Sequence, residues 1–253
     1  MKKIILLIGF LFLLSSLCFA QDAGGPLGIP FVDFGVRSAE NNQEVALSLQ
    51  LLLLLSVISL APSIIILCTS FLRIAIVFDF IKRALSLQQV PPNQVLMGIA
   101  LFLTLFIMWP TLDQIYINSF QPFAEEKISF EQMYQEAEKP LKVFMWRQMG
   151  NDYNNVELFL QMGNYEKPET KGDVPIHVLI PAFVLHELTV AFYIGILLFI
   201  PFIIIDMVVA STLLSMGMIM LPPVMISMPF KLILFLLVDG WGLITMQLVR
   251  GFG

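Results

Sequence analysis

Four ionisable residues stand inside otherwise apolar stretches of this sequence: Glu187, Asp206, Lys231 and Asp239. A charge at the centre of a bilayer costs roughly 2.5–3.5 kcal/mol even on scales derived from membrane insertion. Such groups therefore pair, face water or face another subunit. They would form either a proton or ion relay, or structural ion pairs between helices and subunits. The mixed signs and the lack of an accompanying polar stripe favour the structural interpretation, in which Lys231 pairs with Glu187 or Asp206.

Catalytic and metal-binding chemistry has little support in the sequence. His186-Glu187 resembles the opening of a zinc-protease motif, which needs a second histidine four residues after the first. Val190 occupies that position, and the only other histidine is His177. The sequence also lacks a nucleophile elbow, a P-loop and a dinucleotide fingerprint. We therefore expect no enzyme activity, no cofactor and no metal site.

The segment 215–223 reads Ser-Met-Gly-Met-Ile-Met-Leu-Pro-Pro. Its alternating methionines and closing prolines are Met216, Met218, Met220, Pro222 and Pro223. A helix would place methionines two apart on different faces, whereas Gly217 and the proline pair favour a loop between two helices. Thioether side chains adapt to irregular shapes. A ring of such loops could close a pore and yield around a passing chain; the alternative is that methionine merely fills a membrane core.

Composition identifies the class of protein. Hydrophobic residues make up 58% of the 253 positions and charged residues 13%, about half of the roughly 25% that is usual in soluble domains. The net charge of −5 and the lack of a basic face argue against nucleic-acid binding. Long uncharged runs exclude a soluble enzyme and a disordered chain, and indicate an integral membrane protein.

The N-terminal residues have the pattern of a targeting segment. Lys2 and Lys3 precede an apolar run, and small residues suit cleavage after Ala20, which predicts a signal peptide over residues 1–20. An uncleaved anchor is the alternative. Glycine, proline and polar residues then predict an irregular lead-in over residues 21–44.

Two apolar regions with a common plan follow, and they predict an all-α membrane protein with two long helical hairpins, at 45–112 and 176–249. The uncharged runs Val45–Cys68 and Asn93–Leu112 are separated by a polar connector, Thr69–Pro92. In each hairpin a proline pair precedes the second helix, where a missing N–H costs nothing. These pairs are Pro91-Pro92 and Pro222-Pro223.

A charged region, residues 113–175, separates the hairpins. Between Asp113 and Asp173 it holds eleven acidic and six basic residues, so it must be exposed to water. Apolar spacing at Phe130, Met133 and Tyr134 predicts short amphipathic helices. Removal of the signal peptide would leave the basic connector in the cytoplasm and this helical domain on the extracytoplasmic side.

Motifs across nearly all of residues 45–249 resemble the FliP family of flagellar export-gate proteins. In chain order they are Thr69-Ser70-Phe71, Arg73-Ile74, Pro91-Pro92-Asn93-Gln94-Val95-Leu96, Ala100-Leu101-Phe102-Leu103-Thr104, Gln121-Pro122-Phe123, Pro181-Ala182-Phe183-Val184, Glu187-Leu188, Phe199 to Asp206, Met216-Gly217-Met218, Met220, Pro222-Pro223, Pro229-Phe230-Lys231-Leu232 and Val238-Asp239-Gly240-Trp241. Among the departures, His186 replaces a small hydroxyl residue, Ser86 replaces a glycine and Ile219 interrupts a run of methionines.

The resemblance implies a core subunit of a type III secretion export gate in the bacterial inner membrane, at the flagellar basal body. Five copies would form a ring-shaped helical stack with FliQ-like and FliR-like subunits, and unfolded flagellar proteins would pass through it, driven by an ATPase elsewhere and by the proton-motive force. The family's methionine gasket maps onto Met216, Met218 and Met220, with Ile219 as its departure. Arg73 joins the buried charges as a candidate for contacts between subunits. A virulence injectisome gate and a proton-coupled secondary transporter remain alternatives.

Overall fold

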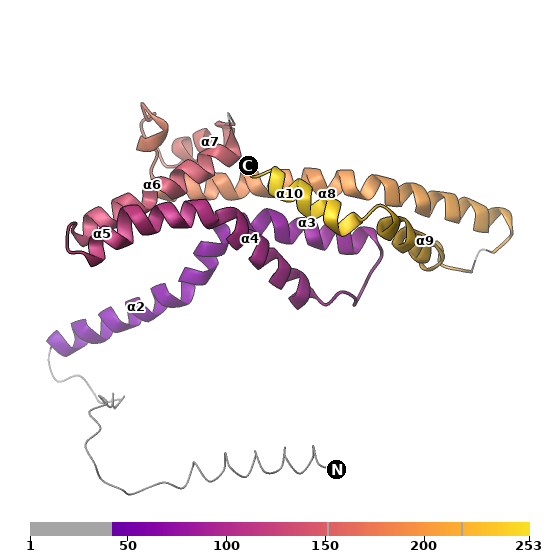
Figure 1. The fold of residues 1–253 in the computed structure, drawn as a ribbon, viewed down its shortest axis with the longest axis horizontal. Coiled ribbons are helices and arrows are strands. Elements are labelled where there is room, and N and C mark those ends of the chain that lie inside the picture. The colour runs from indigo at the N-terminus through magenta and orange to yellow at the C-terminus, as the bar shows by residue number, and fades with distance from the viewer. Residues whose placement is uncertain (1–41, 151, 219) are drawn as a thin grey trace, which may run out of the picture. The chain divides into compact units, whose positions relative to one another are not determined.

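The computed structural model describes residues 42–150, 152–218 and 220–253 (Figure 1). The described residues form helices and contain no β-strand. The chain divides into two units, residues 1–52 and 53–253, and the packing described below belongs to the second. The predicted signal peptide and residues 21–41 of the lead-in lie outside the described residues. An all-α protein with long apolar helices is confirmed.

The first half contains α2 (Asn42–Leu67), α3 (Phe71–Ala84) and α4 (Asn93–Ile115). The uncharged runs are helical as predicted. Residues 71–84 of the polar connector form a further helix, α3, which was not predicted. Its apolar residues at Ile74, Val77, Phe78 and Ile81 have helical spacing and are buried. The connector was described by its charges, whereas the spacing of its apolar residues indicates an amphipathic helix.

Helix α3 ends in a left-handed residue, as many helices do. Ser86 has φ 61°, and the amide of Leu87 donates to the carbonyl of Lys82 at 3.0 Å. Glycine normally occupies this position because a Cβ disfavours positive φ. Proline pair 91–92 then precedes α4, with Pro92 immediately before its first residue.

The charged region folds into η2 (Tyr116–Phe120), α5 (Gln121–Ala124), α6 (Phe130–Met149), α7 (Asn154–Met162) and η3 (Lys171–Asp173). We call residues 113–175 the polar domain. Helix α6 starts with a capping box in which Ser129 and Gln132 each accept the other's backbone N–H. At 20 residues it is longer than expected. Phe130 and Tyr134, predicted to face inward, are exposed; the buried residues lie in its second half.

The second half is built on α8 (Ile176–Ser215), a helix of 40 residues. At 1.5 Å per residue it is about 60 Å long, roughly twice the thickness of a bilayer's hydrocarbon core. Gly217 ends it with φ 75°, and the amide of Met218 donates to the carbonyl of Leu213 at 3.0 Å, a Schellman motif. The loop predicted from the glycine and prolines therefore lies between α8 and α9 (Pro223–Leu237).

The second arm of this hairpin is broken, whereas a single helix was expected. Helix α9 ends at Leu237, α10 (Gly240–Arg250) follows, and the two are bent by 62°. Asp239 lies at the break with φ 50°. Among the described residues, three helical segments are long and apolar enough to cross a membrane, or up to four if α9 and α10 count as one span.

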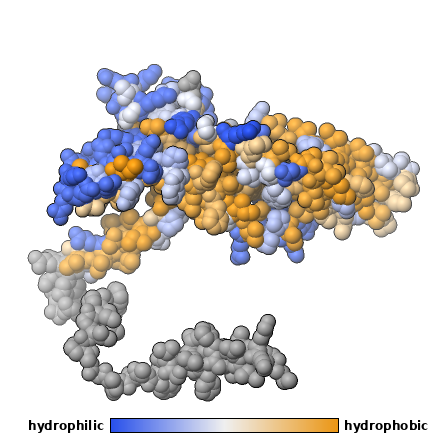
Figure 2. All heavy atoms as spheres, in the orientation of Figure 1, coloured by the Kyte–Doolittle hydropathy of each residue, from blue (hydrophilic) through white to orange (hydrophobic). Residues whose placement is uncertain are grey.

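Helix α3 lies along α8 and parallel to it (Figure 1). Gly195 permits this approach, because a Cβ there would fall 2.5 Å from the ring of Phe80. Helix α9 follows the loop after α8 and packs back against α8. Figure 2 shows hydrophobic side chains over α8, α9 and α10, and hydrophilic ones over the polar domain. One buried ion pair joins α3 to α8, and a second lies where α3, α8 and α9 meet.

Candidate functional site

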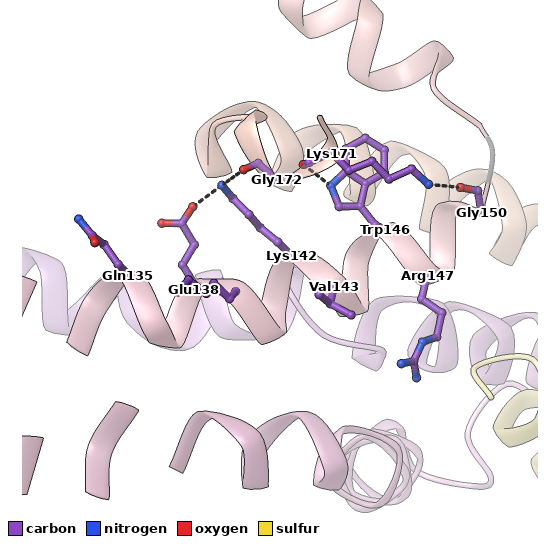
Figure 3. A pocket seen from close by; sticks show the side chains of 10 residues that line it. Gln135, Glu138, Lys142, Val143, Trp146, Arg147, Gly150, Lys171 and Gly172 are labelled. Carbon is purple, nitrogen blue, oxygen red and sulfur yellow. Dashed lines mark hydrogen bonds and ion pairs between the residues drawn. The ribbon is translucent and has the colours of Figure 1, made fainter. Parts of the chain in front are cut away.

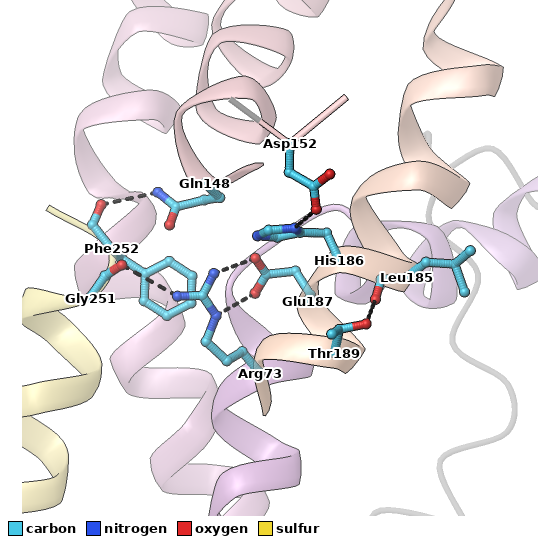
Figure 4. A network of polar contacts seen from close by, with 9 residues as sticks. All are labelled: Arg73, Gln148, Asp152, Leu185, His186, Glu187, Thr189, Gly251 and Phe252. Atoms are coloured by element: carbon cyan, nitrogen blue, oxygen red, sulfur yellow. Dashed lines mark hydrogen bonds and ion pairs between the residues drawn. The ribbon is translucent and has the colours of Figure 1, made fainter. Parts of the chain in front are cut away.

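The first candidate site is an ion pair between Arg73, in the first turn of α3, and Glu187 of α8 (Figure 4). Arg73 Nε donates to Glu187 Oε2 at 2.7 Å, and Nη2 donates to Oε1. The side chains are only 6% and 0% exposed. Such a two-pronged guanidinium–carboxylate contact fixes orientation as well as distance.

Residues near the end of the chain complete the surroundings of Arg73. Its Nη1 donates to the carbonyl of Gly251 at 3.3 Å, and its guanidinium lies 4.0 Å from the ring centre of Phe252. Gln148 of α6 donates to the carbonyl of Phe252 at 3.1 Å, so the same segment also contacts the polar domain. Arg73 therefore joins α3 to α8 and to the segment after α10.

The histidines do not take part in a metal site within the described part of the chain. His186 Nδ1 lies 3.5 Å from Asp152 Oδ2. His177 Nε2 lies 2.8 Å from the hydroxyl oxygen of Tyr165. The described residues contain no group of three or more histidine, cysteine, aspartate or glutamate side chains able to hold a metal ion.

The second site is centred on Lys231 of α9, whose side chain is 2% exposed. Its ammonium donates to Asp206 Oδ2 at 2.6 Å, to Ser86 Oγ at 3.0 Å and to the carbonyl of Ala84 at 3.1 Å. Ser227, one turn before Lys231, donates to Asp206 Oδ1 at 2.5 Å. All three protons of the ammonium group are thus satisfied. The charge also lies at the C-terminal end of α3, where the helix dipole favours a cation.

The ion pairs lie within one chain. Of the two partners predicted for Lys231, the structure brings Asp206 to it, while Glu187 pairs with Arg73. Arg73, Glu187, Asp206 and Lys231 thus find ion-pair partners between helices of the same chain, one of the two arrangements considered for these charges. Asp239 differs: it is exposed and has no ion pair with any described residue.

The gate loop, which we define as residues 216–222, lies at the tip of the α8–α9 hairpin. Its methionines Met216, Met218 and Met220 are 63%, 42% and 97% exposed. Ile219 lies outside the described residues. Pro222 caps α9 and Pro223 occupies its first turn, the position that a missing N–H suits.

Sequence reasoning did not identify Ser86, Ser227 or Phe252 as members of these sites. Ser227 lies four residues before Lys231 on one face of a helix, a spacing that could have suggested it. Nothing local links Ser86 to a residue 145 positions away. Such long-range partners depend on how α3 lies along α8.

Comparison with known proteins identifies the family. The model of the FliP family matches residues 54–248. The flagellar biosynthetic protein FliP of Treponema pallidum is 59% identical over 248 residues, covering 92% of both chains. The protein of that name from Treponema denticola is 61% identical, covering 88% of this chain and 83% of the relative. The Bacillus subtilis protein is 50% identical, covering 86% and 97%.

This chain belongs to the FliP family. Family membership, together with the apolar helices, makes it a membrane-embedded component of the flagellar export gate, as the resemblance implied. A component of this apparatus assembles with other export subunits. The two ion pairs and the gate loop are therefore parts of a gate subunit.

Proposed function

We propose that several copies of this chain, five by the family's pattern, surround a pore in the bacterial inner membrane with FliQ-like and FliR-like subunits. Unfolded flagellar proteins pass through this pore, and the gate loops close it between passages. The chain performs no chemical step in this proposal. The proton-motive force and an ATPase elsewhere in the machine supply the work.

The exposed gate loop is the observation that carries the proposal. Met216, Met218 and Met220 stand at the tip of a hairpin, and Met220 is almost wholly exposed. Unbranched thioethers exclude water and ions but adopt many shapes. Loops of this kind from several copies would meet as an apolar seal that opens around a polypeptide.

The apolar surface of the single chain also supports assembly. In the most apolar 18-residue stretch of α8, only 17% of the residues are buried within the chain. Exposed apolar patches of this extent need lipid or a partner. Because α8 is about twice as long as the hydrocarbon core is thick, lipid alone cannot cover it. Neighbouring subunits would cover the rest.

The seal is tested by replacing Met216, Met218 and Met220 together with alanine in the assembled gate. Truncated side chains leave gaps that water can enter, so we expect ion conductance across vesicles to rise. Replacement of Met207, which is exposed on α8 away from the gate loop, is the matched control. Conductance equal to that of the wild type would refute the seal.

A proton-coupled transporter fits the ion pairs less well. Glu187 is fully buried and held by two donors of Arg73, so it offers no opening to a proton path. Substrate-dependent proton flux by the single purified chain in liposomes would favour that class. Isolation of a multi-subunit ring would favour the gate.

A further inference from the structure

The polar domain contains a basic groove of about 680 Å³ beside the second half of α6 (Figure 3). Four cations, one acid and one aromatic side chain contribute to its lining: Lys139, Lys142, Arg147, Lys171, Glu138 and Trp146. We call this set the basic groove. It lies outside the candidate membrane spans, which end at Ala124 and resume at Ile176. The groove is therefore open to a water-borne partner.

The cations of the groove differ in how firmly they are held, and Lys171 lies over the ring of Trp146 at 5.3 Å. Lys139 pairs with Glu136 at 2.5 Å and Lys142 with Glu138 at 2.6 Å, each one turn away on the same helix. The Lys139 pair is exposed, and such pairs contribute little. Lys142 is only 16% exposed and also donates to the carbonyl of Gly172 at 3.0 Å. Arg147 has no ion pair among the described residues. The groove also offers apolar surface, since Val143 on its wall is 55% exposed. It suits an aromatic side chain flanked by carboxylates.

The chain carries that chemistry at the other end of α6. Phe123 and Phe130 meet edge to face with ring centres 6.3 Å apart, and are 40% and 67% exposed. Glu125, Glu126 and Glu131 are their neighbours in the sequence, with Lys127 as the one base between residues 123 and 131. We call residues 123–131 the acidic tip. Hydrogen bonds from Lys127 and Gln121 lower the pKa of Glu125 below its ordinary range, which keeps its carboxylate charged.

The acidic tip cannot reach the groove of its own chain. Phe130 and Val143 lie on one continuous helix, about 20 Å apart along its axis at 1.5 Å per residue. The helix keeps them apart, so a second copy must supply the partner. Contacts between two different surfaces of identical subunits repeat head to tail and close into a ring when the rotation allows.

We propose that the acidic tip of one copy binds the basic groove of the next. This contact rests on the proposed ring and supplies one interface within it. Phe130 packs against the exposed Val143, while Glu126 and Glu131 face Lys139 and Arg147. The charges also set the direction in which copies join, since like charges would meet in the reverse arrangement.

Charge reversal tests the contact in the full chain, produced with its gate subunits and purified in mild detergent. One variant carries Glu126→Lys and Glu131→Lys, a second carries Lys139→Glu and Arg147→Glu, and a third carries all four. Native mass spectrometry measures the share of chains in multi-copy assemblies. The first and second variants should each lower that share roughly tenfold. The third variant should restore it, because opposite charges face each other again.

The matched control is Glu166→Lys with Glu169→Lys, which changes the net charge of the polar domain by the same amount as the tip reversal. It should assemble like the wild type. Chains carrying Phe130→Cys, produced together with differently tagged chains carrying Val143→Cys, should also form a disulfide between copies.

Other outcomes would overturn the contact. If the combined variant assembles no better than the single reversals, the two surfaces do not meet. If only the groove reversal has an effect, the groove holds an anion or another protein. Normal rings in all variants would leave the proposed gate standing without this interface, whereas a wild-type chain that stays single would refute both.

Discussion

Each end of α3 lies at an ion pair that involves α8, and the two pairs are built differently. At its first turn, Arg73 grips Glu187 with two donors and both side chains are almost fully buried. At its last turn, Lys231 reaches from α9 to Asp206, whose side chain is 30% exposed, and completes its bonds with Ser86 and a backbone carbonyl.

The difference separates a fixed end from an adaptable one. A guanidinium fork matches a carboxylate in one geometry, whereas an ammonium on a flexible stem can rotate among acceptors. The lysine site joins α9 to α8 and α3, and α9 starts at the gate loop. The adaptable tie thus lies on the hairpin that yields in the proposed gate, and the rigid tie lies beside the polar domain.

The largest expected effect comes from Glu187→Gln. The substitution leaves the buried Arg73 cation without its counter-charge, which costs about 3–5 kcal/mol in comparable sites. We expect a large fall in the thermal stability of the purified protein and loss of assembled gate. An unchanged melting temperature would show that the pair does not hold α3 in place.

Asp206→Asn should have a smaller effect, about 2 kcal/mol. Lys231 keeps Ser86 and the carbonyl of Ala84 as acceptors, and water can approach because Asp206 is partly exposed. Thermal unfolding of both variants side by side provides the measurement. If Asp206→Asn were the more damaging, the assignment of rigid and adaptable ends would be reversed.

Substitutions at Ser86 should sharpen the comparison further. Ser86→Ala keeps the unfavourable positive φ and removes an acceptor from Lys231, so we expect a loss of about 1 kcal/mol. Ser86→Gly also removes the acceptor but relieves the backbone, and should cost less. Equal losses in unfolding experiments would mean that backbone strain at this position is negligible.

The smallest expected effect concerns pH in the polar domain. Hydrogen bonds from the side chain and backbone of Thr170 lower the pKa of Asp173 from 3.8. A lowered folded pKa means that the stabilisation is present above pH 3.8 and is lost as pH falls through the lower folded value. The η3 turn should therefore loosen in acid.

Trp146 reports on that turn, because its indole donates to the carbonyl of Lys171 at 3.0 Å. With Trp109 and Trp241 replaced by phenylalanine, its fluorescence should change in acid and lose this transition in Asp173→Asn. A transition that survives this substitution would have another origin.

The sequence was sufficient for the elements that depend on local signals. Long apolar runs predicted α2, α4 and α8, and Gly217 with Pro222-Pro223 predicted the gate loop. Helix α3 was not predicted, because the interpretation of residues 69–92 rested on their charges and not on the helical spacing of their apolar residues. The break after α9 had a signal that was overlooked, since Asp239-Gly240 is a dipeptide typical of turns.

The sequence limited the possible partners of each buried charge but did not determine which of them pair. Lys231 had two possible partners, and only the packing of α9 against α8 selects Asp206. Arg73 and Glu187 lie 114 residues apart, and they meet because α3 runs parallel to α8. No local pattern contains that information.

The central claim is that the gate loop lines the path of the exported protein. The most direct measurement places a photo-reactive side chain at Met220 in gates that hold a stalled export substrate. We predict an adduct between position 220 and the substrate, and none from Met207, which is equally apolar and 68% exposed on α8. Adducts from both positions at equal yield, or from Met207 alone, would contradict the account.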